Sequence, residues 1–378
     1  MIHTVEFRNF KALRHVKLDL ERFTVLVGPN ASGKTSILEG LCYLTRRSEQ
    51  TAQPTISFQE NPSSVWTRGA KEPIVIALEA DEGSCKVEFT PAGFVPNSIP
   101  ESPLESSSPT SWKYQAFNSK DKIGIWQPGM AAIPELVASF LRLESRRLAI
   151  PSIGRESEPR VSWDGEGLAS ALVYMRLNRP KTFDQLLALL RMVCPYVEGI
   201  RFGRVETHKN ERETFLSEQG VQQELTVKRA YWADEILFDM KAAPNIPARM
   251  VSDGTLLILG LLAVIMGPDH PKLILLDDLD HGLHPRAQRD LVALLRKLLD
   301  QDPELQIVAS THSPYLLDQL EPKEVRLTTR LDDGSVACAR LDEHPDFEKW
   351  KEAMTPGEFW SMVGEKWVGE RQLEAAGS

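Results

Sequence analysis

A glycine-rich octapeptide, GPNASGKT, occupies residues 28–35 and fits the spacing G-x-x-x-x-G-K-[ST]. Backbone N–H groups of such a loop and the start of the following helix bind phosphate oxygens, because both carry partial positive charge. Lys34 is predicted to reach the β- and γ-phosphates of ATP, and the Thr35 hydroxyl to ligate Mg²⁺. The other residues assigned to the nucleotide are Asn30, Ala31, Ser32, Gly33 and Ser36.

Two adjacent carboxylates, Asp277 and Asp278, end the apolar run of residues 272–276. A buried strand that ends in two acids places them at the carboxyl edge of a sheet, where open α/β sheets bind their ligands. Asp277 is predicted to hold Mg²⁺ through water, and Asp278 to polarise the attacking water. The alternative is a solvated acidic turn, which the glycine-rich loop elsewhere in the chain disfavours.

Two further segments complete the predicted site. His312 follows another apolar strand in VASTHSPYLLD, where it is expected to contact the γ-phosphate or the attacking water, although a lone histidine is more often structural. In VSDGTLLIL, Ser252 and Gly254 open a helix, with Asp253 near its positive end. We expect this helix start to bind the γ-phosphate held by a second copy of the chain.

Strands and helices alternate along the chain, which predicts an α/β fold with a mostly parallel sheet flanked by helices. The glycine-rich loop lies between an apolar strand and a helix, as a phosphate-binding loop requires. Residues 96–121 are rich in Ser and Pro and predict a mobile surface loop. Strands are predicted at 3–10, 16–20, 23–27, 73–80, 85–90, 272–276 and 305–310, helices within 130–197 (133–149 and 182–197) and at 254–266 and 285–300, and β-rich structure over 200–241.

The bulk composition is that of a globular protein, with 42% hydrophobic and 26% charged residues among 378. No run of 18 apolar residues exists and the N-terminus does not resemble a signal peptide, so we expect a soluble cytoplasmic protein without membrane contact. A formal net charge of -9 argues against a generally basic nucleic-acid binder. Cys42, Cys85, Cys194 and Cys338 lack a CxxC spacing and are expected to be reduced thiols.

Five segments of the chain resemble the ABC-type ATPases of the SMC, RecF and OLD group, also called AAA-family ATPases. The resemblance implies a P-loop NTPase fold with an ABC-type head, which dimerises around two Mg-ATP molecules. Each P-loop would be completed by the partner's Ser252, Asp253 and Gly254. The segments are FRNFKALRHVKLDL, VLVGPNASGKTSILEGL, VSDGTLLILGLLA, LILLDDLDHGLHP and VASTHSPYLLD.

The resemblance also implies a domain plan. It has an N-terminal lobe of the head at 1–129, an inserted helical and β lid subdomain at 130–235, a C-terminal lobe at 236–330, and a tail at 331–378. The tail carries Trp350, Trp360 and Trp367, which are expected to pack on the head or to form a partner surface. A Toprim nuclease domain, found in many OLD proteins, is not expected in the short remainder after the head.

The chain departs from the pattern of these ATPases at three points. Asp278 replaces the usual Glu, Leu279-Asp280 replaces Pro-Glu, and the glutamine loop has only the weak candidates Gln59 and Gln115. Asp keeps the carboxylate but shortens its reach by one methylene, and catalytic geometry is sensitive at about 1 Å. We therefore expect slow but real ATP hydrolysis.

Three functions remain open from the sequence. The first is an ATPase that gates a separately encoded effector, such as a nuclease or toxin in antiviral defence; the second is a DNA-repair or recombination ATPase; the third is a non-hydrolysing ATP-dependent scaffold. The second function would use basic residues to bind DNA, whereas the alternative is that they pair with Glu144, Glu156 and Glu158. These residues are Arg142, Arg146, Arg147, Arg155, Arg160, Arg201 and Arg204.

Overall fold

The structure is a computed structural model, and its chain forms two compact units. Unit 1 comprises residues 1–142 and 271–378, and unit 2 comprises residues 143–270. The domain boundaries expected at 129/130, 235/236 and 330/331 remain a prediction. The structure describes residues 1–45, 67, 69–70, 72–81, 83–90, 111–117, 138–154, 156–216 and 222–377.

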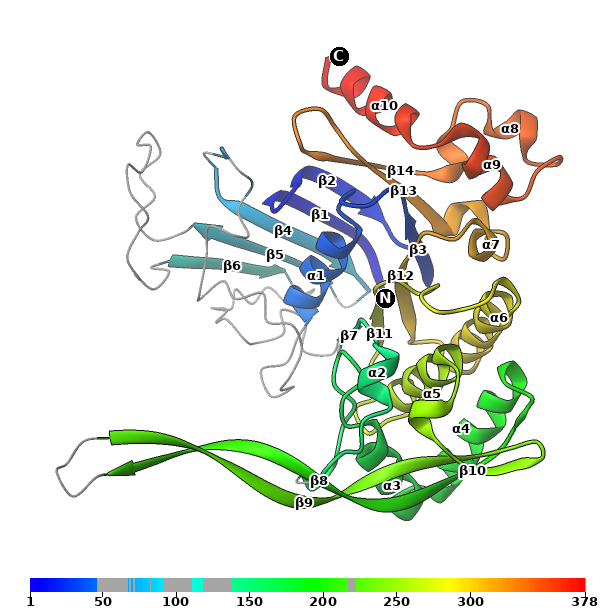
Figure 1. Ribbon diagram of the computed structural model, residues 1–378. Helices are drawn as coiled ribbons and strands as arrows, with labels where there is room; N and C mark the ends of the chain where they lie inside the picture. The colour runs from blue at the N-terminus through cyan, green and yellow to red at the C-terminus, as the bar shows by residue number, and fades with distance from the viewer. Residues whose placement is uncertain are drawn as a thin grey trace. The chain divides into compact units, whose positions relative to one another are not determined.

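A six-stranded sheet forms the centre of unit 1, in the order β14-β13-β3-β12-β11-β7 (Figure 1). All neighbouring strands are parallel except β13 and β14. Every residue of β3, β11 and β12 is buried, as expected where both faces of a parallel sheet are covered. The parallel strands therefore deliver their carboxyl ends to one edge. The bounds are β3 Phe23–Val27, β7 Ala138–Leu141, β11 Leu273–Leu276, β12 Gln306–Thr311, β13 Val325–Arg330 and β14 Val336–Arg340.

Strand β7 corrects the helix that the sequence predicts over 133–149. Its four residues are all buried and pair in parallel with β11, and only Ser145–Leu148 (α2) of the later residues is helical. A run of four residues, three of them apolar, does not reveal a period, so the local pattern cannot distinguish a strand from a buried helix. Pairing with β11 is what makes residues 138–141 a strand.

A second sheet of unit 1 is antiparallel, in the order β2-β1-β4-β5-β6. Strand β6 corrects the loop predicted over 96–121, because residues 111–117 pair with β5. The segment WKYQAF favours a strand, but the surrounding Ser and Pro residues hid that signal. The rest of that predicted loop lies outside the described residues. The bounds are β1 Ile2–Phe10, β2 Leu13–Asp19, β4 Ile74–Ala80, β5 Gly83–Thr90 and β6 Ser111–Phe117.

Helices and a C-terminal tail complete unit 1. Helix α10 packs on β13 and β14, and α9 packs on α7. In the tail Trp367 is buried and Trp360 is half-buried, whereas Trp350 is 40% exposed. The tail thus packs on the sheet through α10, with Trp367 buried against the ring of His344. The bounds are α1 Lys34–Thr45, α6 Pro285–Gln301, α7 Pro314–Leu317, α8 Phe347–Trp350, α9 Pro356–Val363, α10 Lys366–Gly377 and the 3₁₀ helices Pro322–Glu324 and Leu341–Glu343.

Unit 2 combines a helical cluster with a long β-hairpin (Figure 1). Helix α5 is nearly all apolar, and its Leu259 and Leu262 are fully buried against neighbouring helices. The hairpin confirms the β-rich structure predicted over 200–241. None of the helices that the structure describes in either unit is long and apolar enough to cross a membrane. The bounds are α3 Leu168–Asn178, α4 Pro180–Val193, β8 Val197–Leu216, β9 Gln222–Met240, β10 Ala243–Pro247, the 3₁₀ helix Ala248–Met250 and α5 Asp253–Ile265.

Candidate nucleotide-binding site

The glycine-rich loop runs from the end of β3 to the start of α1, and its backbone requires glycine at two positions. Gly28 and Gly33 have φ of 153° and 92°. A Cβ atom at Gly28 would lie 2.1 Å from the Thr328 carbonyl oxygen, and one at Gly33 would lie 2.9 Å from Val336 Cγ2. The loop is therefore pressed against β13 and β14, and the hydroxyls of Ser32 and Thr328 hydrogen bond at 2.6 Å.

Lys34 lies inside this loop and is only 6% exposed. Its ammonium donates hydrogen bonds to the carbonyl oxygens of Gly28 and Pro29, each at 2.9 Å. Burial lowers the pKa of Lys34, and the nearby Asp278 and Asp277 carboxylates oppose that shift. The ammonium makes no ion pair within the part of the chain that the structure describes. A buried cation held only by neutral acceptors fits an anionic phosphate group.

Thr35 and Asp277 meet at the first turn of α1. The Thr35 hydroxyl donates to Asp277 Oδ2 at 2.9 Å and to Oδ1 at 3.2 Å, and the Asp277 side chain is 2% exposed. Across the described ranges no group of three or more His, Cys, Asp and Glu side chains could hold a metal. One hydroxyl and one carboxylate fit Mg²⁺, which needs few protein ligands when phosphates and water supply the rest.

Asp278 projects from a left-handed backbone position, with φ of 58°. Asp is among the few residues that adopt this conformation at low cost. Its backbone N–H donates to Ser310 Oγ at 2.9 Å, and its side chain is 36% exposed. The turn thus separates a buried Asp277 from a more accessible Asp278, so the two acids can have different roles.

His312 reaches the same sheet edge at the end of β12, and its side chain is exposed. Its backbone N–H donates to Asp280 Oδ1 at 3.1 Å, and the Thr311 hydroxyl donates to the same oxygen at 2.6 Å. Asp280 therefore joins the loop that carries the acids to the loop that carries His312. From the sequence, Asp280 was recognised only as a departure from the Pro-Glu pattern. The available signal was a third carboxylate two residues after Asp278.

Arg142 also lies at this edge, although the sequence indicated it only as a DNA contact. Its guanidinium is 3.9 Å from Asp277 Oδ2 and 3.7 Å from Asp278 Oδ2. Ser310, which sequence reasoning passed over, bridges the same two acids. Arg142 lies outside the five matching segments, and Ser310 lies in one of them, VASTHSPYLLD, without a predicted role. The pairing of β7 and β12 with the sheet brings both residues to the acids.

Ser252 caps α5 in unit 2, which confirms the predicted helix start. Its hydroxyl accepts a hydrogen bond from the Thr255 backbone N–H at 3.4 Å. Ser252 and Asp253 are exposed, and Gly254 is partly exposed. The helix start is therefore accessible to an external group.

Four of the other arginines suggested for DNA form ion pairs within unit 2. Arg201 binds Asp239 through two hydrogen bonds of 2.7 and 2.6 Å. The partners are mostly aspartates and not the predicted Glu144, Glu156 and Glu158. Arg146 is exposed without an ion pair to a described residue, and Arg155 lies outside the described residues. The remaining pairs are Arg147 with Asp164 and Glu166, Arg160 with Asp269, and Arg204 with Asp234.

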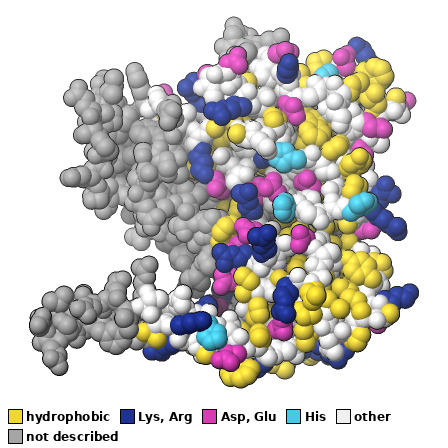
Figure 2. Space-filling model, viewed as in Figure 1, with side chains coloured by type: hydrophobic (Ala, Val, Ile, Leu, Met, Phe, Trp, Pro, Cys, Tyr) yellow, Lys and Arg dark blue, Asp and Glu magenta, His cyan; other side chains and the backbone are white. Residues whose placement is uncertain are grey.

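Described basic and acidic side chains are intermixed on the face shown in Figure 2. This face therefore offers scattered charges of both signs. A nucleic-acid binder would instead carry one continuous basic stripe. The candidate glutamine-loop residues add nothing to the site, because Gln59 and the side chain of Gln115 lie outside the described residues.

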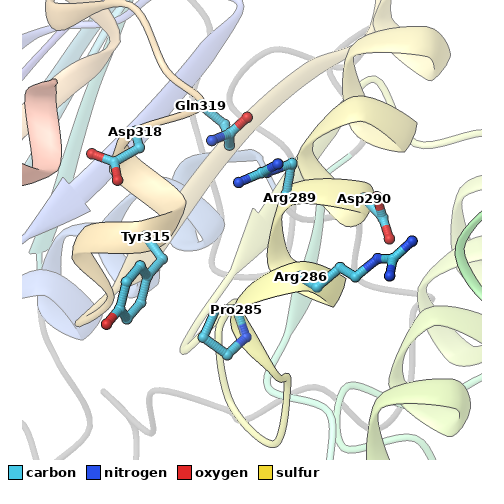
Figure 3. A pocket seen from close by; sticks show the side chains of 7 residues that line it. All are labelled: Pro285, Arg286, Arg289, Asp290, Tyr315, Asp318 and Gln319. Carbon is cyan, nitrogen blue, oxygen red and sulfur yellow. The ribbon is translucent and has the colours of Figure 1, made fainter.

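A separate pocket of about 510 Å³ lies between the start of α6 and the end of α7 (Figure 3). In Figure 3 the Arg289 side chain extends from α6 toward the loop that carries Gln319. None of the predicted nucleotide residues lines this pocket. Its lining residues are Pro285, Arg286, Arg289, Asp290, Tyr315, Asp318 and Gln319.

The parallel sheet and the loop, acids and histidine at its edge define a P-loop ATPase head of the ABC type. Residues 23–318, most of the chain, match the family described as "AAA domain, putative AbiEii toxin, Type IV TA system". The chain belongs to this AAA-domain family. The predicted P-loop α/β fold and the ABC-type head are confirmed.

Comparison with solved structures and curated proteins adds more distant similarities. A crystal structure of an Smc head bound to the C-winged helix domain of ScpA aligns with TM-score 0.50 and 13% identity, over 90% of this chain and 98% of that chain. This likeness shows the fold. An SMC head domain from Thermotoga maritima aligns with TM-score 0.46 and 11% identity over 90% and 98% of the two chains. The Septu protein PtuA of Bacillus thuringiensis is 43% identical over 49 residues, which are 13% of this chain and 12% of that protein.

Proposed function

We propose that the chain binds Mg-ATP through Lys34, Thr35 and Asp277 and hydrolyses it slowly. The observation that carries this proposal is the 2.9 Å hydrogen bond from Thr35 Oγ1 to Asp277 Oδ2, beside the buried Lys34 ammonium. These groups lie at the start of α1 and just after β11, far apart in sequence, and they supply the cation, hydroxyl and carboxylate that a magnesium nucleotide requires. The loop residues from Asn30 to Gly33, together with Ser36, would donate backbone N–H groups to phosphate oxygens.

The chemical step is assigned to Asp278 and His312. Asp278, the more accessible acid, accepts a proton from the attacking water or orients it, and His312 donates a hydrogen bond to the γ-phosphate or the water. Asp280 holds the backbone of His312 in place. Bound Mg²⁺ would polarise phosphate oxygens as a Lewis acid. The shorter reach of Asp compared with Glu is the reason to expect slow turnover.

We further propose that two copies of the chain close around two nucleotides. The start of α5 supports this proposal, because Ser252 and Asp253 are exposed at the positive end of a 13-residue helix. This segment would contact the γ-phosphate held by the partner copy. ATP binding would then drive assembly, and hydrolysis would reverse it.

The closed dimer is proposed to gate a separately encoded effector in antiviral defence. The family description, which names a toxin of a type IV TA system, and the short match to the Septu protein PtuA support this direction. Six exposed apolar side chains of unit 2 are candidates for contact with such a partner. They are Ile150, Leu177, Met192, Tyr196, Trp232 and Met250.

Nucleotide binding is tested by thermal melting of Lys34→Ala with and without Mg-ATP. Wild type should gain stability from the nucleotide by mass action, whereas the variant should gain none. Lys17→Ala, which removes the same charge from an exposed position on β2, is the matched control. An equal ATP-induced shift in Lys34→Ala and wild type would contradict the site.

A further inference from the structure

Arg142 stands beside Asp277 because their strands are paired in register. Leu141 of β7 lies opposite Leu276 of β11, and the next residues along the two strands are Arg142 and Asp277. The Leu141 carbonyl oxygen accepts the Asp277 backbone N–H at 2.8 Å, which continues the ladder beyond the last paired residues. The arginine is therefore placed at the acids by the sheet itself.

The guanidinium of Arg142 spans both acids, through Nη1 to Asp277 Oδ2 at 3.9 Å and Nη2 to Asp278 Oδ2 at 3.7 Å. Among the described residues it is the one cation that forms ion pairs with either acid. Two adjacent carboxylates repel each other, and Asp277 is nearly fully buried, so a neighbouring positive charge offsets that repulsion. A divalent metal held at Asp277 would be attracted by the same carboxylate charge.

We propose that Arg142 is the internal counter-cation of the acidic pair and leaves it when metal and nucleotide bind together. The inference rests on the proposed role of Asp277 as a metal ligand. The Arg142 side chain is 54% exposed, so it has room to move. Arg142 directly follows β7, at the sheet edge where the phosphate-binding loop lies. Helix α1, which follows that loop, packs against β7. Phosphate oxygens, which arginine binds readily, give the released guanidinium a new partner.

This arrangement couples metal binding to nucleotide binding. Without nucleotide, a metal ion must displace Arg142 with no compensating contact, so metal alone binds weakly. With nucleotide present, Arg142 exchanges the acids for phosphate, and each ligand raises the affinity for the other by the same factor. Arg142 is thus a positioning residue whose effect appears in the coupling between the two ligands, before any hydrolysis.

The test is metal binding to Arg142→Gln in the absence of nucleotide, with Mn²⁺ as the probe and electron paramagnetic resonance as the readout. Mn²⁺ suits oxygen ligands, as Mg²⁺ does. Removing one half-exposed charge near two carboxylates should tighten Mn²⁺ binding about tenfold. The ratio of the ATP dissociation constants measured with EDTA and with Mg²⁺ should fall by about the same factor, because the two couplings are reciprocal.

Two matched variants distinguish the effect of the positive charge at position 142 from the effect of removing any exposed positive charge. Arg146→Gln removes an exposed arginine four residues later and should leave Mn²⁺ binding at the wild-type value. Arg142→Lys keeps the charge and should restore weak Mn²⁺ binding. Equal Mn²⁺ affinity in Arg142→Gln and wild type would overturn the inference, and so would Arg142→Lys behaving like Arg142→Gln.

Failure of the inference can be distinguished from failure of the proposed function. If ATP affinity in wild type is the same with EDTA and with Mg²⁺, the metal site assigned to Thr35 and Asp277 is wrong. If wild type shows that coupling and Arg142→Gln retains all of it, the site stands and only the role of Arg142 is refuted.

Discussion

The Ser310 hydroxyl donates a hydrogen bond to Asp277 Oδ1 at 2.7 Å and at the same time accepts the backbone N–H of Asp278 at 2.9 Å. Ser310 is fully buried on β12, next to the strand that carries the acids. One hydroxyl therefore fixes both the side chain of the first acid and the turn that presents the second.

Replacing Ser310 with Ala should loosen both acids. The change leaves a buried carboxylate oxygen and a backbone N–H without this partner, which costs about 1–3 kcal/mol of unfolding free energy. We also expect weaker Mg²⁺-dependent ATP binding, because Asp277 loses a positioning contact. Urea unfolding and ATP titration measure the two effects. Ser139→Ala, a buried serine on β7, is the control, and equal losses in both variants would refute the bridging role.

Asp278→Asn should separate ATP binding from turnover. The amide keeps the shape of the side chain but cannot accept a proton from water, so hydrolysis should stop while ATP binding persists. The closed dimer should accumulate, as measured by light scattering in the presence of ATP. Hydrolysis at the wild-type rate would show that Asp278 is not the base, and His312 or a partner residue would carry that role.

Asp278→Glu tests whether reach limits the rate. The longer side chain restores the carboxylate position usual in these ATPases, and a displacement of about 1 Å can cost about 100-fold in rate. Phosphate release by this variant should match or exceed that of wild type. A rate as low as that of Asp278→Asn would indicate that the left-handed backbone at this position already compensates for the shorter aspartate.

Ser252→Arg should prevent dimer closure without weakening ATP binding to the monomer. The substitution adds bulk and charge at the exposed start of α5, where we propose that the partner's phosphate binds. Light scattering with ATP should detect monomer for this variant and dimer for wild type. Ser157→Arg places the same side chain at another exposed serine of unit 2. If the mass with ATP is the same in wild type and Ser252→Arg, the shared site is wrong.

The C-terminal tail should weaken in mild acid because of His344. Burial lowers the pKa of His344 from its ordinary value of 6.5, and Asp346 opposes the shift. The ring packs edge-on against Phe359 and Trp367, with centroid distances of 5.2 and 5.0 Å. Because the folded pKa is below the unfolded one, stability is complete above about pH 6.5 and is lost as pH falls through the folded pKa.

Urea unfolding followed by tryptophan fluorescence at pH 7.5 and 5.5 measures this effect. His344→Gln cannot titrate and should lose less stability between the two pH values than wild type does. His208→Gln, at an exposed position on β8, should behave as wild type. An identical pH dependence in wild type and His344→Gln would exclude the histidine as its origin.

Much of this protein could be predicted from the sequence because the relevant signals are local. The glycine spacing at residues 28–35 has few backbone solutions, and apolar runs ending in Asp277 and His312 indicate buried strands whose ends carry polar groups. Parallel strands bring such ends to one edge, so the meeting of Thr35 with Asp277 followed from the strand order that the fold class implies.

Only the tertiary structure decided which other side chains join that edge. The run Ala138–Leu141 is too short to show a period, and its pairing with β11 both made it a strand and brought Arg142 to the acids. Asp280 and Ser310 likewise look like ordinary polar residues until β12 lies beside β11. These contacts join segments about 30 or more residues apart, and a pattern confined to one segment carries no information about its neighbours in the sheet.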